Sequence, residues 1–208
     1  MIRLPEDINQ NIEAALKNAH SVPGFLADNE LRFLGALAAI VPALGAVVEI
    51  GSFKGKSTVV LASIAARYGL GQVVAIDPHA GLSYLGNHVA PVYQNPTFSE
   101  FLASLKAARV EENVEVRRDF SRNVAAEWNR PIRLLWIDGD HSYPGCKQDF
   151  DLFSPYLSEG AVIAFHDSLN AFEGPIRVFV EEILRSDRFG PSGFVHSIAW
   201  SQYRPSRR

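Results

Sequence analysis

A short apolar run, a glycine-bearing turn and a helix-forming run follow one another without a gap between Val47 and Thr58. This succession predicts a strand, a tight turn and a helix. Gly51 and Gly55 can adopt positive φ and let the backbone approach a ligand closely, and the free N–H groups of the helix face the same space. The stretch therefore predicts a site for a nucleotide-like ligand at the end of a strand.

The turn lacks the two common glycine patterns that bind phosphates. No G-x-G-x-x-G follows the strand, and the spacing from Gly51 to Lys56 is one residue too short for a phosphate-binding loop. Glu49 lies near the end of the predicted strand, where a carboxylate repels phosphate and attracts a cationic or hydroxyl-bearing ligand. This acid therefore favours a ligand that presents a cation or a hydroxyl group at this point, and disfavours a phosphate.

Continuous apolar runs alternate with amphipathic segments from Val47 to Leu184, which predicts an α/β fold with a Rossmann-like, doubly wound and mostly parallel sheet. The predicted strands are Val47–Ile50, Val73–Ile76, Val114–Arg117, Arg133–Ile137 and Ala161–Phe165. The predicted helices are about Lys56–Tyr68, Thr97–Arg109, Arg122–Trp128, Tyr143–Leu157 and Pro175–Leu184. Alternating apolar and polar residues over Gly193–Tyr203 predict a late antiparallel strand.

Two accessory helices precede this core. Apolar residues recur at helical spacing from Ile8 to Ala19 and from Leu31 to Val41, with Pro23-Gly24 between them. We expect these helices to cover a sheet edge, the mouth of the site or a subunit contact, so a homo-oligomer stays open. The 208 residues suit a single domain, with a helical cap over 1–45 and the core over 46–208.

The composition excludes several classes of function. A net charge of −3 and a pI near 6.1 do not favour nucleic acid as a partner, and the basic Arg204–Arg208 end is expected to be a solvated tail. Cys146 is the only cysteine, so an intramolecular disulfide and a thiolate-rich metal site are excluded. No apolar run reaches the roughly 18 residues that a membrane span needs, and a cytoplasmic protein is expected.

Acids follow or end four of the predicted strands, at Glu49, Asp77, Asp138 and Asp167. Ligands of open α/β sheets bind beyond the carboxyl ends of the strands, so we expect these acids along one edge. Asp77 ends the second strand, where an acid can accept hydrogen bonds from both ribose hydroxyls. The alternative is a turn-forming Asp before Pro78.

The most polar cluster of the chain, Asp138 to Tyr143, directly follows a strand predicted to be buried. His141 could act as a general base near neutral pH, since an unperturbed imidazole titrates near pH 6.5. Alternatively, Asp138 and Asp140 cap the next helix and His141 packs against it. His166-Asp167 ends the following strand. With Asp138, this pair could hold a divalent cation, or it could be a hydrogen-bonded Asp–His pair that orients the loop.

With these motifs, the chain resembles the class I S-adenosylmethionine-dependent methyltransferases. Val47–Gly55 is similar to their first motif, E/D-x-G-x-x-x-G, and Asp77 to their ribose-binding acid. The stretches Trp136–Tyr143, Asp149–Leu152 and Gly160–Asp167 resemble a bacterial branch that includes macrolide-sugar O-methyltransferases and relatives from cephalosporin biosynthesis. The resemblance covers about Gly24 to Arg185.

The resemblance implies a role for each matching position. It implies that the methionine part of S-adenosylmethionine (SAM) lies among Glu49, Gly51, Ser52 and Gly55, and that Asp119, Phe120 and Ser121 contact adenine. By similarity to catechol O-methyltransferase and the sugar enzymes, Asp138, His166 and Asp167 would bind magnesium or manganese, and His141 would be the general base. Relatives carry a carboxylate where this chain has His166, which lowers the negative charge offered to magnesium and makes manganese, iron or no metal more plausible than in the family on average.

These inferences predict a SAM-dependent O-methyltransferase that acts on the hydroxyl of a small molecule, with Asp138 and His141 as its catalytic pair. The turn-rich Gly81–Pro96 segment, with Tyr84, His88 and Tyr93, is expected to shape the acceptor pocket. A nicotinamide-dependent oxidoreductase is one rival, although G-x-G-x-x-G is absent. A cofactor-binding module that has lost catalysis is another.

Overall fold

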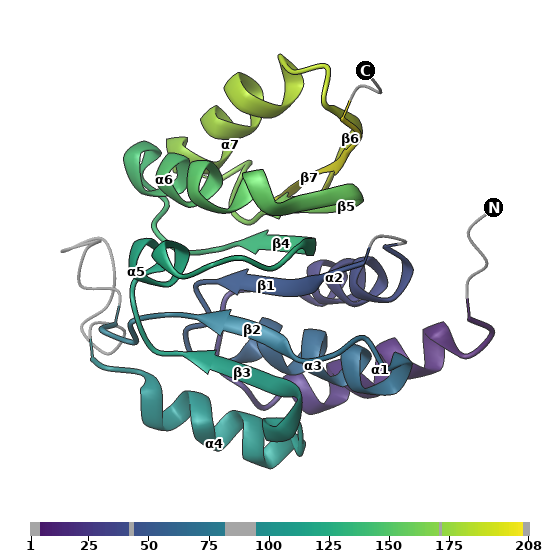
Figure 1. Ribbon diagram of the computed structural model, residues 1–208. Helices are drawn as coiled ribbons and strands as arrows, with labels where there is room; N and C mark the ends of the chain where they lie inside the picture. The colour runs from purple at the N-terminus through teal and green to yellow at the C-terminus, as the bar shows by residue number, and fades with distance from the viewer. Residues whose placement is uncertain (1–4, 42–43, 82–94, 171, 206–208) are drawn as a thin grey trace.

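In the computed structural model, seven strands among the described residues, 5–41, 44–81, 95–170 and 172–205, form one sheet with helices on both faces (Figure 1). The strand order is β3-β2-β1-β4-β5-β7-β6. Strands β1 to β5 pair in parallel, whereas β7 runs antiparallel to β5 and β6 antiparallel to β7. The strands are β1 Ala46–Ile50, β2 Val73–Ile76, β3 Val114–Arg117, β4 Ile132–Ile137, β5 Leu157–Phe165, β6 Phe189–Val195 and β7 Ile198–Tyr203.

The chain reverses its direction across the sheet between β1 and β4. From β1 it moves outward to β3 and then returns to β4 on the other side of β1. In the register of this pair, Ile50 is level with Ile137, so the two strands end together. A doubly wound sheet binds its ligands at such a switch point. Strands β2 and β4 are buried throughout, because helices cover both faces.

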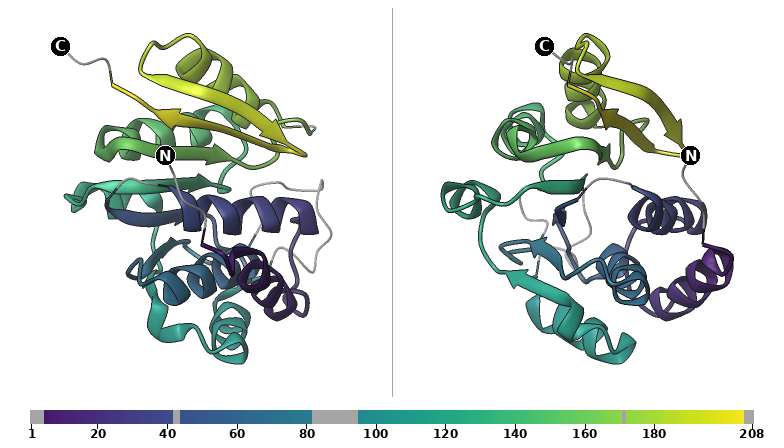
Figure 2. Two further views of the ribbon diagram at one scale, coloured as in Figure 1. Left: turned by 90° about the vertical axis from the view of Figure 1, so that its right-hand side faces the viewer. Right: turned by 45° about the vertical axis from the view of Figure 1, so that its right-hand side comes forward.

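The helices divide between the two faces of the sheet. Helices α1, α2 and α3 pack together on one face, and α5, α6 and α7 lie on the other, as the right-hand view of Figure 2 shows. The α-helices are α1 Ile8–Ala19, α2 Asp28–Ile40, α3 Lys56–Tyr68, α4 Phe98–Ala108, α5 Ser121–Ala126, α6 Tyr143–Phe153 and α7 Glu173–Val178. Short 3₁₀ segments are η3 Glu111–Asn113 and η4 Ser154–Tyr156, and a π-helical segment, η5 Phe179–Leu184, continues α7.

The predicted α/β fold is confirmed, and most elements lie within two residues of their expected bounds. Helix α6 ends at Phe153, four residues early, because Pro155 lacks the N–H that an α-helix interior requires. Strand β5 starts at Leu157 instead of Ala161. The apolar stripes of α1 and α2 are buried as their spacing predicted.

The expectation of a single late strand over Gly193–Tyr203 is wrong, because this region belongs to two strands. β6 and β7 make a hairpin whose turn contains His196, with a φ of 53°, and Ser197. Both turn residues donate hydrogen bonds to Glu30 of α2. The alternating pattern continues through the turn, so the sequence offered no break at this point.

Three other expectations concern membrane spans, the single cysteine and two segments of the chain. No helix of the described residues is long and apolar enough to cross a membrane. Cys146 is buried, and burial raises the pKa of its thiol, as befits a packing residue. Residues 82–94 of the turn-rich segment and 206–208 of the basic tail lie outside the described residues.

Candidate active site

The turn after β1 is fastened to both neighbouring strands. The Gly51 N–H donates to the Ile76 carbonyl at 2.9 Å, and the Asp138 N–H donates to the Ile50 carbonyl at 2.8 Å. Gly51 has a φ of +89°, and a Cβ there would lie 2.2 Å from the carbonyl oxygen of Asp138. Gly55, with a φ of +94°, precedes α3 as its N-cap. The turn therefore needs glycine at position 51 for space as well as for conformation.

Glu49 is fully buried behind this turn. Its carboxylate accepts hydrogen bonds from the hydroxyls of Ser57 and Thr58, both at 2.5 Å. Burial raises the pKa of Glu49 to about 8, although the two hydroxyls oppose the rise. Glu49 joins β1 to the first turn of α3, and neither Glu49 nor Gly55 is among the residues that line the cavities described next.

Two cavities meet where β1 and β4 end. A cavity of about 390 Å³ extends from this point toward β2 and α5, with Asp77, Phe120 and Ser121 in its wall. A cavity of about 370 Å³ extends toward β5 and the segment between α1 and α2. We call the first the β2-side cavity and the second the β5-side cavity. Both are lined by Gly51, Phe53 and Asp138.

Asp77 fixes the turn and faces the β2-side cavity. One carboxylate oxygen accepts from the Phe53 N–H at 2.7 Å and the other from the His79 N–H at 2.6 Å. The bond to His79, two residues on, is an Asx turn, so the turn-forming role considered from the sequence is present. Each oxygen keeps a lone pair for a ligand, and the side chain lines the cavity.

The residues after β3 divide between two environments. Phe120 and Ser121 line the β2-side cavity, whereas Asp119 lines a separate polar cleft and accepts bonds from the Phe120 N–H and the Asn123 amide. The Phe120 side chain is 46% exposed. Trp128, which ends the predicted Arg122–Trp128 helix, is buried in the core.

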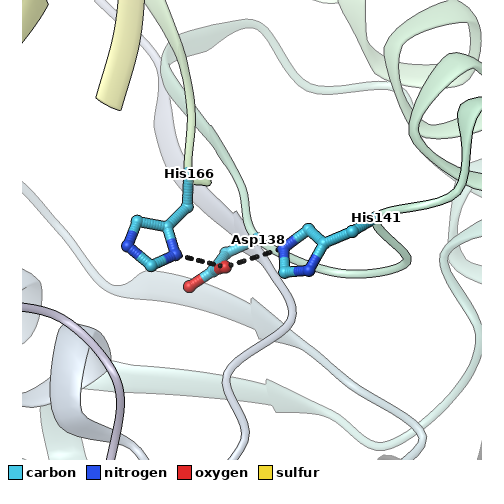
Figure 3. Close-up of side chains that lie close together, drawn as sticks. All are labelled: Asp138, His141 and His166. Atoms are coloured by element: carbon cyan, nitrogen blue, oxygen red, sulfur yellow. Dashed lines mark hydrogen bonds and ion pairs between the residues drawn. The ribbon is translucent and has the colours of Figure 1, made fainter. Parts of the chain in front are cut away.

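Asp138, His141 and His166 converge at the ends of β4 and β5 (Figure 3). One oxygen of Asp138 lies 3.0 Å from His166 Nδ1 and 3.3 Å from His141 Nε2. Burial raises the pKa of Asp138, but the two imidazoles outweigh burial and hold the pKa below its ordinary value. Asp167 completes the group, with its carboxylate 3.6 Å from His166 Nδ1 and 3.8 Å from His141 Nδ1.

The loop that carries His141 is held by its own polar residues. The Asp140 carboxylate accepts from the Ser142 N–H at 2.9 Å, and the Ser142 hydroxyl caps α6 by accepting from the Gly145 N–H. The capping role considered for Asp138 therefore belongs to Ser142. The His141 ring packs against Phe172, 4.9 Å between ring centroids, and lines the β5-side cavity.

A sequence family described as a methyltransferase domain matches residues 48–168, more than half of the chain. The chain belongs to this methyltransferase family. The match begins within β1 and ends just after His166 and Asp167, so it contains the strand-end residues that line the two cavities but neither N-terminal helix. The family predicted from the sequence is confirmed.

Solved structures of O-methyltransferases share the fold of this methyltransferase. A *Bacillus cereus* enzyme in complex with S-adenosylhomocysteine (SAH) is 21% identical, with a TM-score of 0.65 over 97% of this chain and 93% of that chain. TomG from *Streptomyces achromogenes*, in complex with SAM, is 16% identical, with a TM-score of 0.65 over 98% and 92%. NovP is 12% identical, with a TM-score of 0.71 over 95% and 98%.

The polar cluster of this methyltransferase has a donor set that fits a divalent transition metal. A carboxylate oxygen of Asp138 and one ring nitrogen each from His141 and His166 lie within 4.8 Å of one another. Two imidazoles and a carboxylate suit manganese, iron or zinc, whereas magnesium prefers oxygen ligands. Asp138 and His166 belong to the metal set predicted from the sequence, and Asp167 lies beside it.

Sequence reasoning missed two acids of the site. Asp149 of α6 lines the β2-side cavity, accepts a hydrogen bond from Ser121, and has a pKa raised to about 6 by burial. Glu30 of α2 contacts His166 from the side opposite Asp138. Neither acid follows a strand, so the rule that placed the other candidates could not find them. Pro23–Leu26 of the α1–α2 connection also line the β5-side cavity, so this connection contributes to the wall of the site.

Proposed function

We propose that this methyltransferase transfers the methyl group of SAM to a hydroxyl of a small molecule, with His141 as the general base. The observation that carries the proposal is the meeting of the two cavities at Gly51, Phe53 and Asp138. One cavity has groups for a nucleoside, and the other has an imidazole–carboxylate pair. A methyl group at the junction would be within reach of both.

The β2-side cavity is suited to the adenosine part of the donor. Asp77 can accept from ribose hydroxyls, and Phe120 with Ser121 lies where the resemblance puts adenine. The hydroxyl of Ser52 is buried in the wall of the β5-side cavity and has no hydrogen-bond partner among the described residues. A ligand group there would satisfy this hydroxyl, which supports the proposed place of the methionine part beside Gly51 and Ser52.

The β5-side cavity is suited to a small acceptor. Its volume of about 370 Å³ is in the range of small-molecule sites. Phe25, Phe53 and Phe172 supply apolar walls, and the polar cluster stands at its floor. These walls and the net charge of −3 favour a small molecule over a nucleic acid as the acceptor.

His141 is placed to take the proton of the acceptor hydroxyl. With Nε2–H donating to Asp138, the lone pair lies on Nδ1, which has no hydrogen-bond partner among the described residues. The acceptor O–H bond breaks as its proton passes to Nδ1. The oxygen forms a bond to the methyl carbon, and the carbon–sulfur bond breaks to release neutral SAH. Asp138 stabilises the imidazolium that results.

A divalent ion held by Asp138 and His166, with the Asp167 carboxylate beside them and His141 kept as the base, would lower the pKa of an acceptor hydroxyl. The protein's own contribution is alignment together with deprotonation by His141, because a sulfonium is already a good leaving group. His166, held among Glu30, Asp138 and Asp167, lies at one side of the cavity.

The test combines binding with turnover. Calorimetry should show SAH binding and no comparable binding of NAD. Radiolabelled methyl transfer from SAM should then be measured to a panel of small phenols, vicinal diols and sugars, with Mn²⁺, with Mg²⁺ and with EDTA. Preference for NAD would favour the oxidoreductase, and SAH binding without transfer to any acceptor would favour the non-catalytic module.

A further inference from the structure

Glu30 is a buried carboxylate of α2 that lies outside the matched family region, on the side of His166 away from the cavities. We infer that Glu30 is a positioning residue that fixes the orientation of the His166 ring. Its importance for methyl transfer rests on the proposed function, but the contact itself does not. Glu30 is 1% exposed, and the family match starts only at residue 48.

The two ring nitrogens of His166 face two different acids. Nδ1 lies 3.0 Å from Asp138, and Nε2 lies 3.5 Å from the Glu30 carboxylate. A flipped ring would place carbon atoms against both carboxylates, so the pair of acids selects one orientation. The Trp136 ring, 5.7 Å away between centroids, packs against the imidazole and adds a steric limit.

This orientation has a direct chemical consequence at the cluster. With Glu30 accepting from Nε2–H, the Nδ1 side is the one presented to Asp138 and Asp167. In metal sites a second carboxylate on the outer ring nitrogen fixes the tautomer of the ligating histidine, and its loss commonly weakens metal binding by about 10–100-fold. Glu30 stands in that outer position relative to His166.

Glu30 has more partners than a helix cap requires. One of its oxygens accepts from the Ala27 N–H at 2.9 Å, which satisfies a free backbone N–H at the start of α2. Its other oxygen accepts from His196 Nδ1 at 3.0 Å and from the N–H and hydroxyl of Ser197. A cap alone would function at the surface. Here the carboxylate is buried, and its hydrogen bonds hold it in place beside His166.

The test uses Glu30→Gln, which keeps the shape of the side chain but removes its charge. We expect the ¹⁵N chemical shifts of the His166 ring, read in long-range ¹H–¹⁵N spectra at one fixed pH, to change. We also expect the affinity for Mn²⁺, followed by electron paramagnetic resonance, to fall about 10–100-fold. SAH affinity should stay within about threefold, because Glu30 is not in the wall of either cavity.

Two controls separate positioning from general stabilisation. Glu13→Gln removes an exposed acid that pairs with Arg32 and should change neither readout. Ser197→Ala removes only the hydroxyl bond to the other oxygen of Glu30. The bonds from the Ala27 N–H, His196 and the Ser197 N–H remain and keep the carboxylate in place, so this variant should lower the melting temperature while leaving the His166 shifts as in the wild type.

The inference is overturned if Glu30→Gln leaves the His166 shifts unchanged, or if Ser197→Ala shifts them equally. The ¹⁵N spectra decide the matter whether or not the wild type binds Mn²⁺. If Glu30→Gln does not fold, Glu30→Asp provides the same two readouts, and unchanged His166 shifts in that shortened variant overturn the inference. Neither readout uses methyl transfer, so this failure is distinct from failure of the proposed function, which SAH binding and turnover report.

Discussion

Glu49 lies in β1, and Asp138 directly follows the neighbouring parallel strand β4, two residues apart in level if the register of β1 and β4 is extended past their ends. Glu49 is within its strand, fully buried, bonded to two hydroxyls, and has a pKa raised to about 8. Asp138 follows its strand, faces both cavities, lies between two imidazoles, and has a lowered pKa.

The difference shows that position along a strand decides what an acid at the sheet edge does. A side chain within a strand covered on both faces points into a layer of helix, and Glu49 meets Ser57 and Thr58 of α3 there. A side chain one residue past the strand lies in the turn, where the crevice begins. Hydroxyl partners hold a carboxylate in place, whereas imidazole partners keep it charged and allow it to assist proton transfer.

The proposed catalytic role of Asp138 and its imidazole partners, which Glu49 lacks, is most strongly tested by His141→Ala. Loss of the base should lower kcat by about 10²–10⁴-fold, while SAH affinity stays within about threefold. Steady-state turnover and calorimetry measure the two quantities. Methyl transfer within tenfold of the wild type at neutral pH would show that His141 is not the base, and that the imidazoles around Asp138 have another purpose.

Gly51→Ala tests the backbone contact that keeps the ends of β1 and β4 together. A Cβ at 2.2 Å from the Asp138 carbonyl oxygen cannot be accommodated without moving the strands, so the free energy of unfolding should fall by about 3 kcal/mol. Gly69→Ala is the matched control. It has a positive φ of 63° but no neighbour within 4 Å, and should cost only about 1 kcal/mol. Equal losses in urea titrations would mean that the close approach is unimportant.

Asp77→Asn asks whether a third strand-end acid behaves like Asp138 or like Glu49. The amide cannot match the charge-assisted bonds that Asp77 accepts from the Phe53 and His79 N–H groups and from a ribose. We expect the Kd for SAH to rise about tenfold and kcat at saturating SAM to stay near the wild-type value. An unchanged Kd would place Asp77 with Glu49, as an acid that only holds the fold.

Glu49→Gln tests the raised pKa of the buried Glu49 through the pH dependence of the unfolding free energy. The folded pKa of about 8 lies above the ordinary value of 4.5, so the folded state keeps a proton that the unfolded state has lost. The stability that this proton confers is complete below about pH 4.5 and is lost as pH rises toward 8. Between pH 6 and 7, the unfolding free energy of the wild type should fall relative to Glu49→Gln by about 1 kcal/mol. Parallel pH profiles for the two proteins would contradict the raised pKa.

Much of the fold could be predicted because each element has a local signal. The apolar run before Gly51, the helical spacing from Ile8 to Ala19 and the acids after the strands are all visible in short windows of sequence. Topology then brings the strand ends together, and the convergence of Asp138, His141 and His166 follows from strand order alone.

The remaining features depend on contacts between distant residues. Glu30 bonds to groups 136 and 167 positions away, and these bonds accompany the hairpin turn that the alternating pattern of Gly193–Tyr203 concealed. Whether an acid near a strand end is buried or faces a cavity depends on one or two residues of strand length, as Glu49 illustrates. The predicted roles of Glu49, Gly55 and Asp119 in cofactor binding stay predictions, since none of the three lines the β2-side or β5-side cavity.

The segment between α1 and α2 has a consequence for how such an enzyme diversifies. Pro23–Leu26 forms part of the wall of the β5-side cavity, yet it precedes the matched family region altogether. If the β5-side cavity holds the acceptor as proposed, a change in these four residues would alter acceptor preference without touching the β2-side cavity, because none of them lines that cavity. Since Glu30 of α2 contacts His166, any replacement of the α1–α2 hairpin would have to keep an acid at that position.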